Sequence, residues 1–148
     1  MTATLLAPPA RRAFDALFDP RGVIVAGAST HPGKFGFVSL HNVLSHGYPG
    51  RVFATNLEGS PVLGLDTLRS LDELPEGAAD LIFVCTPKGA NPDLLRTAAA
   101  KGVRAAFLTS AGYGESGEQG RADEAGLVAL CEELGILLAG PNGQGVVS

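Results

Sequence analysis

Short apolar runs rich in Val, Ile and Leu recur along the chain, each followed by a break and then by a stretch with helical spacing. They lie at 22–26, 51–55, 80–85, 105–109 and 136–139. Their apolar residues are consecutive, which is typical of strands buried on both faces of a parallel sheet. We therefore expect an α/β fold: a doubly wound, mostly parallel, Rossmann-like sheet with helices on both faces.

The stretches between these runs predict helices. After the first run, Phe37, Leu40 and Leu44 share one face of a helix that Gly47 closes. Another helix is expected to begin at Asn91, whose side chain can cap the first turn, and to end near Gly102. Between 56 and 75 the pattern is less regular, with a short extended piece at 61–63 and a helical turn near 70–74.

The last predicted helix follows the loop at 110–117. Ser116 and Gln119 have the spacing of a capping box. The helix has a buried stripe at i, i+3, i+4 and i+7, which consists of Leu127, Leu130, Cys131 and Leu134.

Length and charge restrict the class of protein. The 148 residues suit one domain, for which we expect 21–148, with 1–20 as an N-terminal extension that contains a short helix. The sequence ends about nine residues after the last expected strand, so we expect a module of a longer polypeptide. The net charge of −4 argues against nucleic acid as a partner, and no apolar run is long enough to span a membrane. Without a leader signal or a cysteine framework, we expect a cytoplasmic protein.

Ligands of such sheets bind beyond the carboxyl ends of the strands. Four loops should converge there, at 27–36, 55–58, 86–90 and 110–114. We expect the usual strand order 3-2-1-4-5, which places the first and the fourth of these loops face to face across a crevice.

The first loop reads GASTHPGKFG and opens a helix, so its backbone N–H groups and Lys34 favour a bound phosphate. It is not a Walker A loop, because the stretch between Gly27 and Gly33 is one residue longer than that motif allows. In addition, Phe35 stands where the motif has the hydroxyl residue that binds the metal ion. The dinucleotide motif G-x-G-x-x-G is also broken by Ser29. The second strand ends in Thr55-Asn56 and lacks the acid that grips a ribose diol, which leaves only Glu58 for that role.

The remaining reactive side chains do not form a catalytic constellation. Cys85 and Cys131 are expected to be structural, and His41 and His46 to be solvated or capping residues of the first helix. His31 lies nearer the predicted phosphate loop. Glu115 and Glu118 are expected to be acids at a helix start.

Five motifs at strand ends resemble the N-terminal CoA-binding domain of NDP-forming acyl-CoA synthetases. They are Val25-Ala-Gly-Ala-Ser29, Gly33-Lys34-Phe-Gly36, Cys85-Thr-Pro87, Ser110-Ala-Gly-Tyr113 and Gly140-Pro-Asn142. The family includes the succinyl-CoA synthetase alpha subunit, ADP-forming acetyl-CoA synthetase and the synthetase-like region of bacterial protein acetyltransferases. The resemblance spans nearly the whole chain.

The resemblance implies coenzyme A or an acyl-CoA as the ligand. It places phosphates at Ser29, Lys34 and Gly36, the nucleoside near Asn56, and adenosine or pantetheine near Thr86, Pro87, Ser110 and Ala111. The implied site also includes Gly27, Thr30, Phe35, Gly112 and Asn142. No metal site and no catalytic residue are expected in this chain.

The same resemblance implies further domains or subunits in the parent ligase: one bears a phosphorylated histidine, and another is an ATP-grasp domain. This chain contains neither, and Gly143 stands where the family has Cys. The module alone is therefore not expected to be catalytic. Two alternatives stay open, an NAD(P)-binding domain of an oxidoreductase or redox sensor and a free-standing CoA-responsive regulator.

Overall fold

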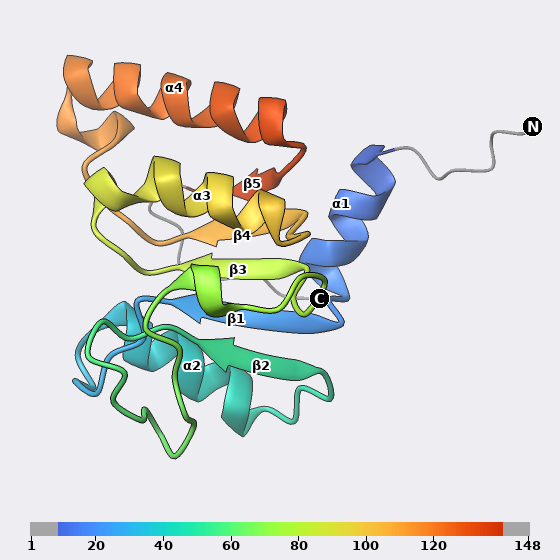
Figure 1. Ribbon diagram of the computed structural model, residues 1–148. Helices are drawn as coiled ribbons and strands as arrows, with labels where there is room; N and C mark the ends of the chain where they lie inside the picture. The colour runs from blue at the N-terminus through green and yellow to red at the C-terminus, as the bar shows by residue number, and fades with distance from the viewer. Residues whose placement is uncertain (1–8, 141–148) are drawn as a thin grey trace, which may run out of the picture.

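A five-stranded, wholly parallel sheet forms the centre of the protein (Figure 1). The computed structural model describes residues 9–140. The strands are β1 (Gly22–Ala26), β2 (Arg51–Ala54), β3 (Leu81–Val84), β4 (Ala105–Leu108) and β5 (Leu137–Ala139). All residues of β1 and β4 are buried, as their uninterrupted apolar sequences predict. The expected α/β fold with a parallel sheet is confirmed.

Helices cover both faces of this sheet (Figure 1). One face carries α1 (Pro9–Phe18) and α2 (Phe35–Ser45), and Ala16 and Leu40 are buried against it. The other carries α3 (Asn91–Ala100) and α4 (Glu118–Leu134). Leu95, Leu127 and Cys131 pack there on the largest core cluster. Of the stripe expected on α4, Leu127, Cys131 and Leu134 pack on this core, whereas Leu130 lines a hollow between α3 and α4.

The strand order is β2-β1-β3-β4-β5, so the expected order 3-2-1-4-5 is wrong. The third strand pairs directly with the first, in a register that sets Val23 opposite Leu81. This happens because the chain after β2 crosses back over β1, with Leu71 and Leu74 buried in the same core cluster as α3 and α4. The topological switch point thus lies between β1 and β3, and their loops are neighbours.

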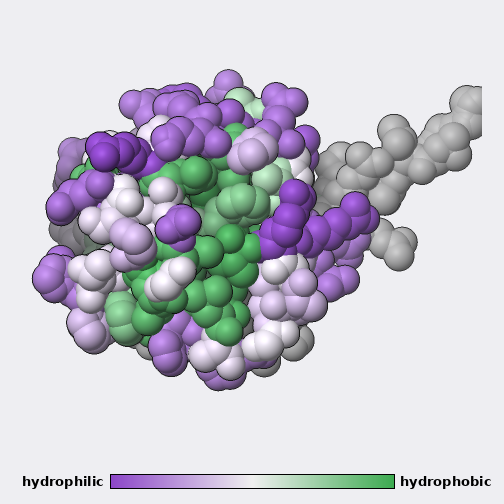
Figure 2. All heavy atoms as spheres, turned by 60° about the horizontal axis from the view of Figure 1, so that its bottom comes forward, coloured by the Kyte–Doolittle hydropathy of each residue, from purple (hydrophilic) through white to green (hydrophobic). Residues whose placement is uncertain are grey.

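The segment between β2 and β3 contains no α-helix, only a short 3₁₀ turn at Leu71–Glu73 and isolated bridges that join Thr55 to Leu68 and Val62 to Leu65. Figure 2 brings forward the side of the molecule that carries α2 and β2 and shows apolar side chains gathered in its middle, with hydrophilic residues around them. The exposed apolar side chains of α2 and the following segment are Phe35, Val38, Leu44, Leu57 and Leu63.

Two helix starts differ from the sequence prediction. Asn91 does not cap α3: Ala90 is the N-cap, and the Asn91 side chain is fully buried beneath the loops. The expected capping box at Ser116 is also wrong, because Ser116 belongs to a 3₁₀ turn, Gly114–Ser116. The N-cap of α4 is Gly117, whose φ of +100° few residues other than glycine adopt.

Candidate functional site

The carboxyl ends of four strands surround a cleft of about 770 Å³. Its walls come from the loops after β1, β2, β3 and β4, the four segments expected from the sequence to converge. One more side chain, Arg69, enters from the segment between β2 and β3. The volume lies within the range of roughly 300–1,000 Å³ that small-molecule sites occupy.

The loop after β1 is fixed to the end of β2. Gly27 leaves the strand with a φ of +84°, in the left-handed region that favours glycine. Its N–H donates to Oγ1 of Thr55 at 3.1 Å, and the N–H of Ala28 donates to the Thr55 carbonyl oxygen at 2.9 Å. These bonds hold the turn in one conformation above the cleft.

The first turn of α2 opens onto this loop with its N–H groups uncapped by a side chain. Lys34 is the N-cap residue, and its side chain makes no capping hydrogen bond. Oγ of Ser29 accepts the N–H of His31 at 3.0 Å, which leaves the Ser29 proton for another acceptor. An ammonium group, a hydroxyl donor and the positive end of a helix together form an anion-binding corner.

Asn56, at the end of β2, joins the two adjacent loops. Its Nδ2 donates to the Ala28 carbonyl oxygen at 3.1 Å. Its Oδ1 accepts the N–H groups of Glu58 at 3.0 Å and Ser60 at 3.3 Å. The amide thus shapes the cleft wall, and its carbonyl oxygen already has two donors.

A buried hydrogen-bond network forms the opposite wall. Oδ1 of Asn91 accepts the hydroxyl proton of Thr86 at 2.8 Å. Its Nδ2 donates to Oγ of Ser110 at 3.0 Å and to the Tyr113 hydroxyl at 3.1 Å. Ser110 in turn donates to the Thr86 carbonyl oxygen at 2.7 Å. One buried side chain therefore holds together the loops that follow β3 and β4.

Both cysteines are free thiols, in different surroundings. Cys131 is buried on the side of α4 that packs on the core, and this desolvation raises its pKa to about 11. Cys85 follows β3 and lines the cleft, where burial raises its pKa while its hydrogen bonds with Ser39 and Thr109 oppose the shift. Both thiols are thus neutral at pH 7.

The cleft brings together most of the residues proposed from the sequence: Gly27, Ser29, Lys34, Phe35, Gly36, Asn56, Thr86, Pro87, Ser110 and Ala111. Thr30 and Gly112 are outside the lining. Thr30 is exposed, and the carbonyl oxygen of Gly112 accepts a hydrogen bond from Lys88. Asn142 lies outside the described residues. Sequence reasoning missed Arg69, which stands in the irregular segment where no periodic pattern marks it.

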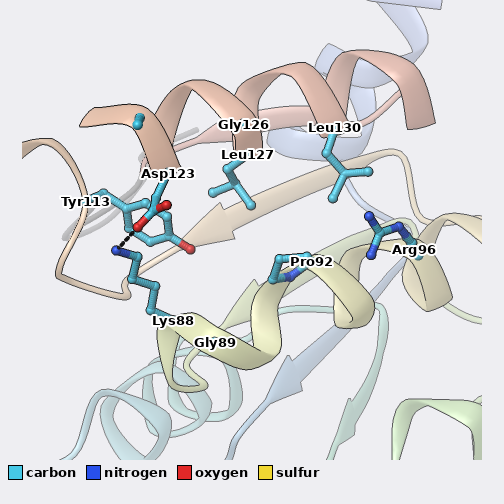
Figure 3. A pocket seen from close by; sticks show the side chains of 10 residues that line it. Lys88, Gly89, Pro92, Arg96, Tyr113, Asp123, Gly126, Leu127 and Leu130 are labelled. Atoms are coloured by element: carbon cyan, nitrogen blue, oxygen red, sulfur yellow. Dashed lines mark hydrogen bonds and ion pairs between the residues drawn. The ribbon is translucent and has the colours of Figure 1, made fainter. Parts of the chain in front are cut away.

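A second hollow of about 450 Å³ lies between α3 and α4 (Figure 3). Pro92, Leu127 and Leu130 form its apolar middle. At one end Nζ of Lys88 reaches Asp123 at 2.6 Å and stands 5.0 Å from the centre of the Tyr113 ring. Through Tyr113 this hollow shares the Asn91 network with the cleft wall.

Within residues 9–140 no group of three His, Cys, Asp or Glu side chains is placed to hold a metal ion. In the same part of the chain, no helix is both long enough and apolar enough to cross a membrane. The groups that the cleft offers to a ligand are hydroxyls and a lysine beside a helix N-terminus. The neutral thiol of Cys85 is not a ready nucleophile.

The family model for the CoA binding domain matches residues 21–148. This chain belongs to that family. The alpha subunit of ADP-forming acetate–CoA ligase I from Pyrococcus furiosus is 34% identical over 137 residues, which are 90% of this chain and 29% of that protein. A trans-feruloyl-CoA synthase from an unknown prokaryote is 34% identical over 86% of this chain and 18% of its own length.

A solved structure shares this fold. The dinucleotide forming acetyl-coenzyme A synthetase 1 of Ca. Korarchaeum cryptofilum, in complex with phosphate and ADP, superposes with a TM-score of 0.79 at 28% identity. The match covers 87% of this chain and 27% of that one. The chain therefore spans less than a third of the ligases it matches and is homologous to their N-terminal part.

Proposed function

We propose that this domain binds coenzyme A, or an acyl-CoA, in the cleft at the carboxyl ends of the strands. The observation that carries the proposal is the anion-binding corner formed by Ser29, Lys34 and the uncapped start of α2. A diphosphate seated there receives backbone N–H groups, a hydroxyl and an ammonium group. Membership of the CoA-binding family supports coenzyme A as the carrier of that diphosphate.

A nicotinamide dinucleotide suits this cleft less well. Dinucleotide folds hold the ribose diol with an acid at the end of the second strand, where this chain has Thr55 and Asn56. Both are occupied with fixing the loops, since Thr55 accepts from Gly27 and Asn56 from Glu58. Glu58 lines the cleft, but its side chain is exposed in the turn that follows β2.

We further propose that the parent protein is an NDP-forming acid–CoA ligase. Several ADP-forming acetate–CoA ligases are among the relatives, which supports a parent that joins a carboxylic acid to CoA with ATP. Such a parent would supply a histidine-bearing domain and an ATP-grasp domain, and this module would present the CoA thiol to them. A cytoplasmic location for the parent remains a prediction from the sequence.

Titration calorimetry tests the binding proposal. Separate titrations with CoA, acetyl-CoA, NADH and ATP should show saturable binding of the two CoA compounds. Binding of NADH more tightly than CoA would overturn the proposal. The ligase proposal needs the full-length protein, which should convert ATP to ADP over many turnovers only when an acid and CoA are also present.

A further inference from the structure

The hollow between α3 and α4 shares no lining residue with the cleft and has no part in the function proposed above (Figure 3). Its volume of about 450 Å³ is within the range of roughly 300–1,000 Å³ that small-molecule sites occupy. Pro92 on α3 and Leu127 and Leu130 on α4 face one another across it. A molecule with an apolar body can therefore bury that body between the two helices.

The end of the hollow beside Tyr113 is held rigid by hydrogen bonds. The hydroxyl of Tyr113 accepts a hydrogen bond from Nδ2 of the buried Asn91 at 3.1 Å, which fixes the ring. Nζ of Lys88 donates to the Asp123 carboxylate and to the Gly112 carbonyl oxygen, both at 2.6 Å. The same ammonium group stands 5.0 Å from the centre of the Tyr113 ring. This wall is formed before any ligand arrives, so binding does not have to order it.

A glycine in the middle of α4 leaves space in the hollow. Gly126 lies in the interior of this 17-residue helix, where glycine is among the least favourable residues. Its φ is not in the left-handed region, and a Cβ at this position would meet nothing within 4 Å. Neither the backbone conformation nor the packing of the described residues therefore requires a glycine here. Because Gly126 lines the hollow, the missing side chain leaves room for a ligand.

The hollow also contains a cation with spare hydrogen-bond donors. Arg96 lines it, on the side of α3 that faces Leu130 in Figure 3. Within residues 9–140 its one ion pair is with Asp93 on the same helix, at 2.9 Å, and both side chains are more than half exposed. An exposed pair of this kind contributes little to stability, and a guanidinium group has five N–H donors. Arg96 can therefore bind the carboxylate of a ligand with its remaining donors.

The charges around the hollow favour a single negative charge on the ligand. The charged side chains that line it, together with Asp93, form two neutral pairs, Lys88 with Asp123 and Arg96 with Asp93. One carboxylate matches the planar fork of Arg96, whereas a phosphate dianion is repelled more strongly by the two acids. The apolar middle and the single available cation thus suit the same kind of molecule.

We propose that this hollow is a second ligand site, which binds a small monocarboxylate with an apolar body. The body packs between Pro92, Leu127 and Leu130, and the carboxylate pairs with Arg96. The inference does not depend on the proposed function, because the hollow and the cleft have no lining residue in common. Both sites can therefore be occupied at the same time.

A titration followed by amide chemical shifts tests this site on the intact chain. The probe is 3-phenylpropionate, and 3-phenylpropanamide is its uncharged counterpart of similar shape. We expect saturable shifts at Gly89, Arg96 and Gly126, with a Kd of about 1 mM for a probe of this size. The amide should bind at least about fivefold more weakly, since it lacks the charge-assisted pair. Saturating CoA should leave the shifts of the acid in place.

A charge variant separates the two parts of the probe. Arg96→Gln should weaken the acid at least about fivefold and change the amide less than about twofold. Arg121→Gln is the matched control, because Arg121 is exposed on α4 and does not line the hollow, and it should leave both affinities unchanged. An equal loss in the two variants would show a nonspecific effect of charge and overturn the proposal.

Filling the hollow gives an independent test. Gly126→Leu places a side chain in the space that the probe occupies, and we expect it to weaken the acid and the amide at least about tenfold. Leucine is a better helix former than glycine, so this variant should unfold at a temperature no lower than that of the wild type. Ala125→Leu is the matched control, because Ala125 is exposed on α4 and does not line the hollow. It should bind both probes like the wild type.

Each contrary result overturns the inference. Shifts confined to Gly27–Gly36 and abolished by CoA would place the probe in the cleft and leave the proposed function intact. Equal binding of the acid and the amide would remove the carboxylate pairing, and unchanged binding to Gly126→Leu would place the probe outside the hollow. Absence of saturable shifts up to the solubility limit of the probe would also overturn the site. A chain that fails to bind CoA would overturn the proposed function alone, since these shifts are measured without CoA.

Discussion

The backbone of Gly36, in the first turn of α2, lies directly against the carbonyl group of Gly27, where β1 ends. A Cβ at position 36 would collide with that oxygen and with the Cα of Ala28, and both are backbone atoms that no side-chain rotation can move. This close approach brings the positive end of the helix to the cleft.

We expect Gly36→Ala to destabilise the fold by roughly 1–3 kcal/mol, the usual cost of overpacking, and to weaken CoA at least about tenfold by displacing the loop. Gly33→Ala is the matched control in the same loop, since a Cβ there meets nothing within 4 Å. Urea unfolding and calorimetry measure the two effects. Equal stability and equal CoA affinity of Gly36→Ala and Gly33→Ala would contradict the described packing.

Removal of the lysine at the start of α2 should affect binding and leave folding intact. Lys34 is exposed and lies at the N-cap of α2 in the cleft. We expect Lys34→Ala to weaken CoA by about 1.5–3 kcal/mol, as for a lost hydrogen bond to a charged group. Lys101→Ala is the charge-matched control, because Lys101 donates to the Asp72 carbonyl oxygen away from the cleft. Unchanged affinity of Lys34→Ala would remove Lys34 from the site.

The regular part of this fold could be predicted from the sequence, and β1 was located at its observed bounds, Gly22–Ala26, by its consecutive apolar residues. The strand order could not be predicted from the sequence, because it depends on where Leu71 and Leu74 pack. The irregular pattern of their segment does not reveal the position of these two side chains. Ser29 and Lys34 were recognised because a loop that opens a helix has a local signature.

Asn91 shows the limit of local patterns. Asn followed by Pro92 and Asp93 is typical of a helix start, so its capping role was a reasonable hypothesis. Two of its three partners, Ser110 and Tyr113, are 19 and 22 residues away in the sequence. Only the folded sheet brings them together, and the same holds for Arg69 in the cleft.

The thiol of Cys85 reports on occupancy of the cleft. Burial raises its pKa above the ordinary value of 9.0, so at pH 7 to 8 we expect slow alkylation by iodoacetamide that quickens about tenfold per pH unit with the thiolate fraction. Saturating CoA should slow the reaction several-fold. Cys131, buried on the side of α4 that packs on the core, should react only after unfolding. Mass spectrometry locates the label, and Cys85→Ser should show none in the folded state.

If CoA leaves the alkylation rate of Cys85 unchanged while calorimetry shows binding, the ligand lies elsewhere than in the cleft. An equal rate for Cys131 and Cys85 in the folded protein would contradict the difference in their burial.

Acid should remove a stabilising contribution of Glu115. The N–H groups of Gly112 and Tyr113 donate to its carboxylate at 2.6 and 3.1 Å, and the Gly112 bond is the main reason that its pKa lies below the ordinary 4.5. A lowered folded-state pKa stabilises the fold above the unfolded-state pKa, and this contribution disappears as the pH falls through the folded-state value.

Glu115→Gln should therefore be less stable than the wild type at pH 7, and the difference should shrink below about pH 4.5. Urea unfolding at pH 7 and pH 3 measures it. Glu132→Gln, on the exposed side of α4, is the control and should show no difference at either pH. If the difference in stability between Glu115→Gln and the wild type is the same at both pH values, this account is contradicted.

The sheet has one direction throughout, so β5 ends at the same edge as the strands around the cleft. Gly140, which leaves β5, approaches the backbone of Leu108 at the end of β4, next to the wall that Thr109 and Ser110 form. A unit that followed this strand would therefore begin beside the cleft, within reach of a ligand held there.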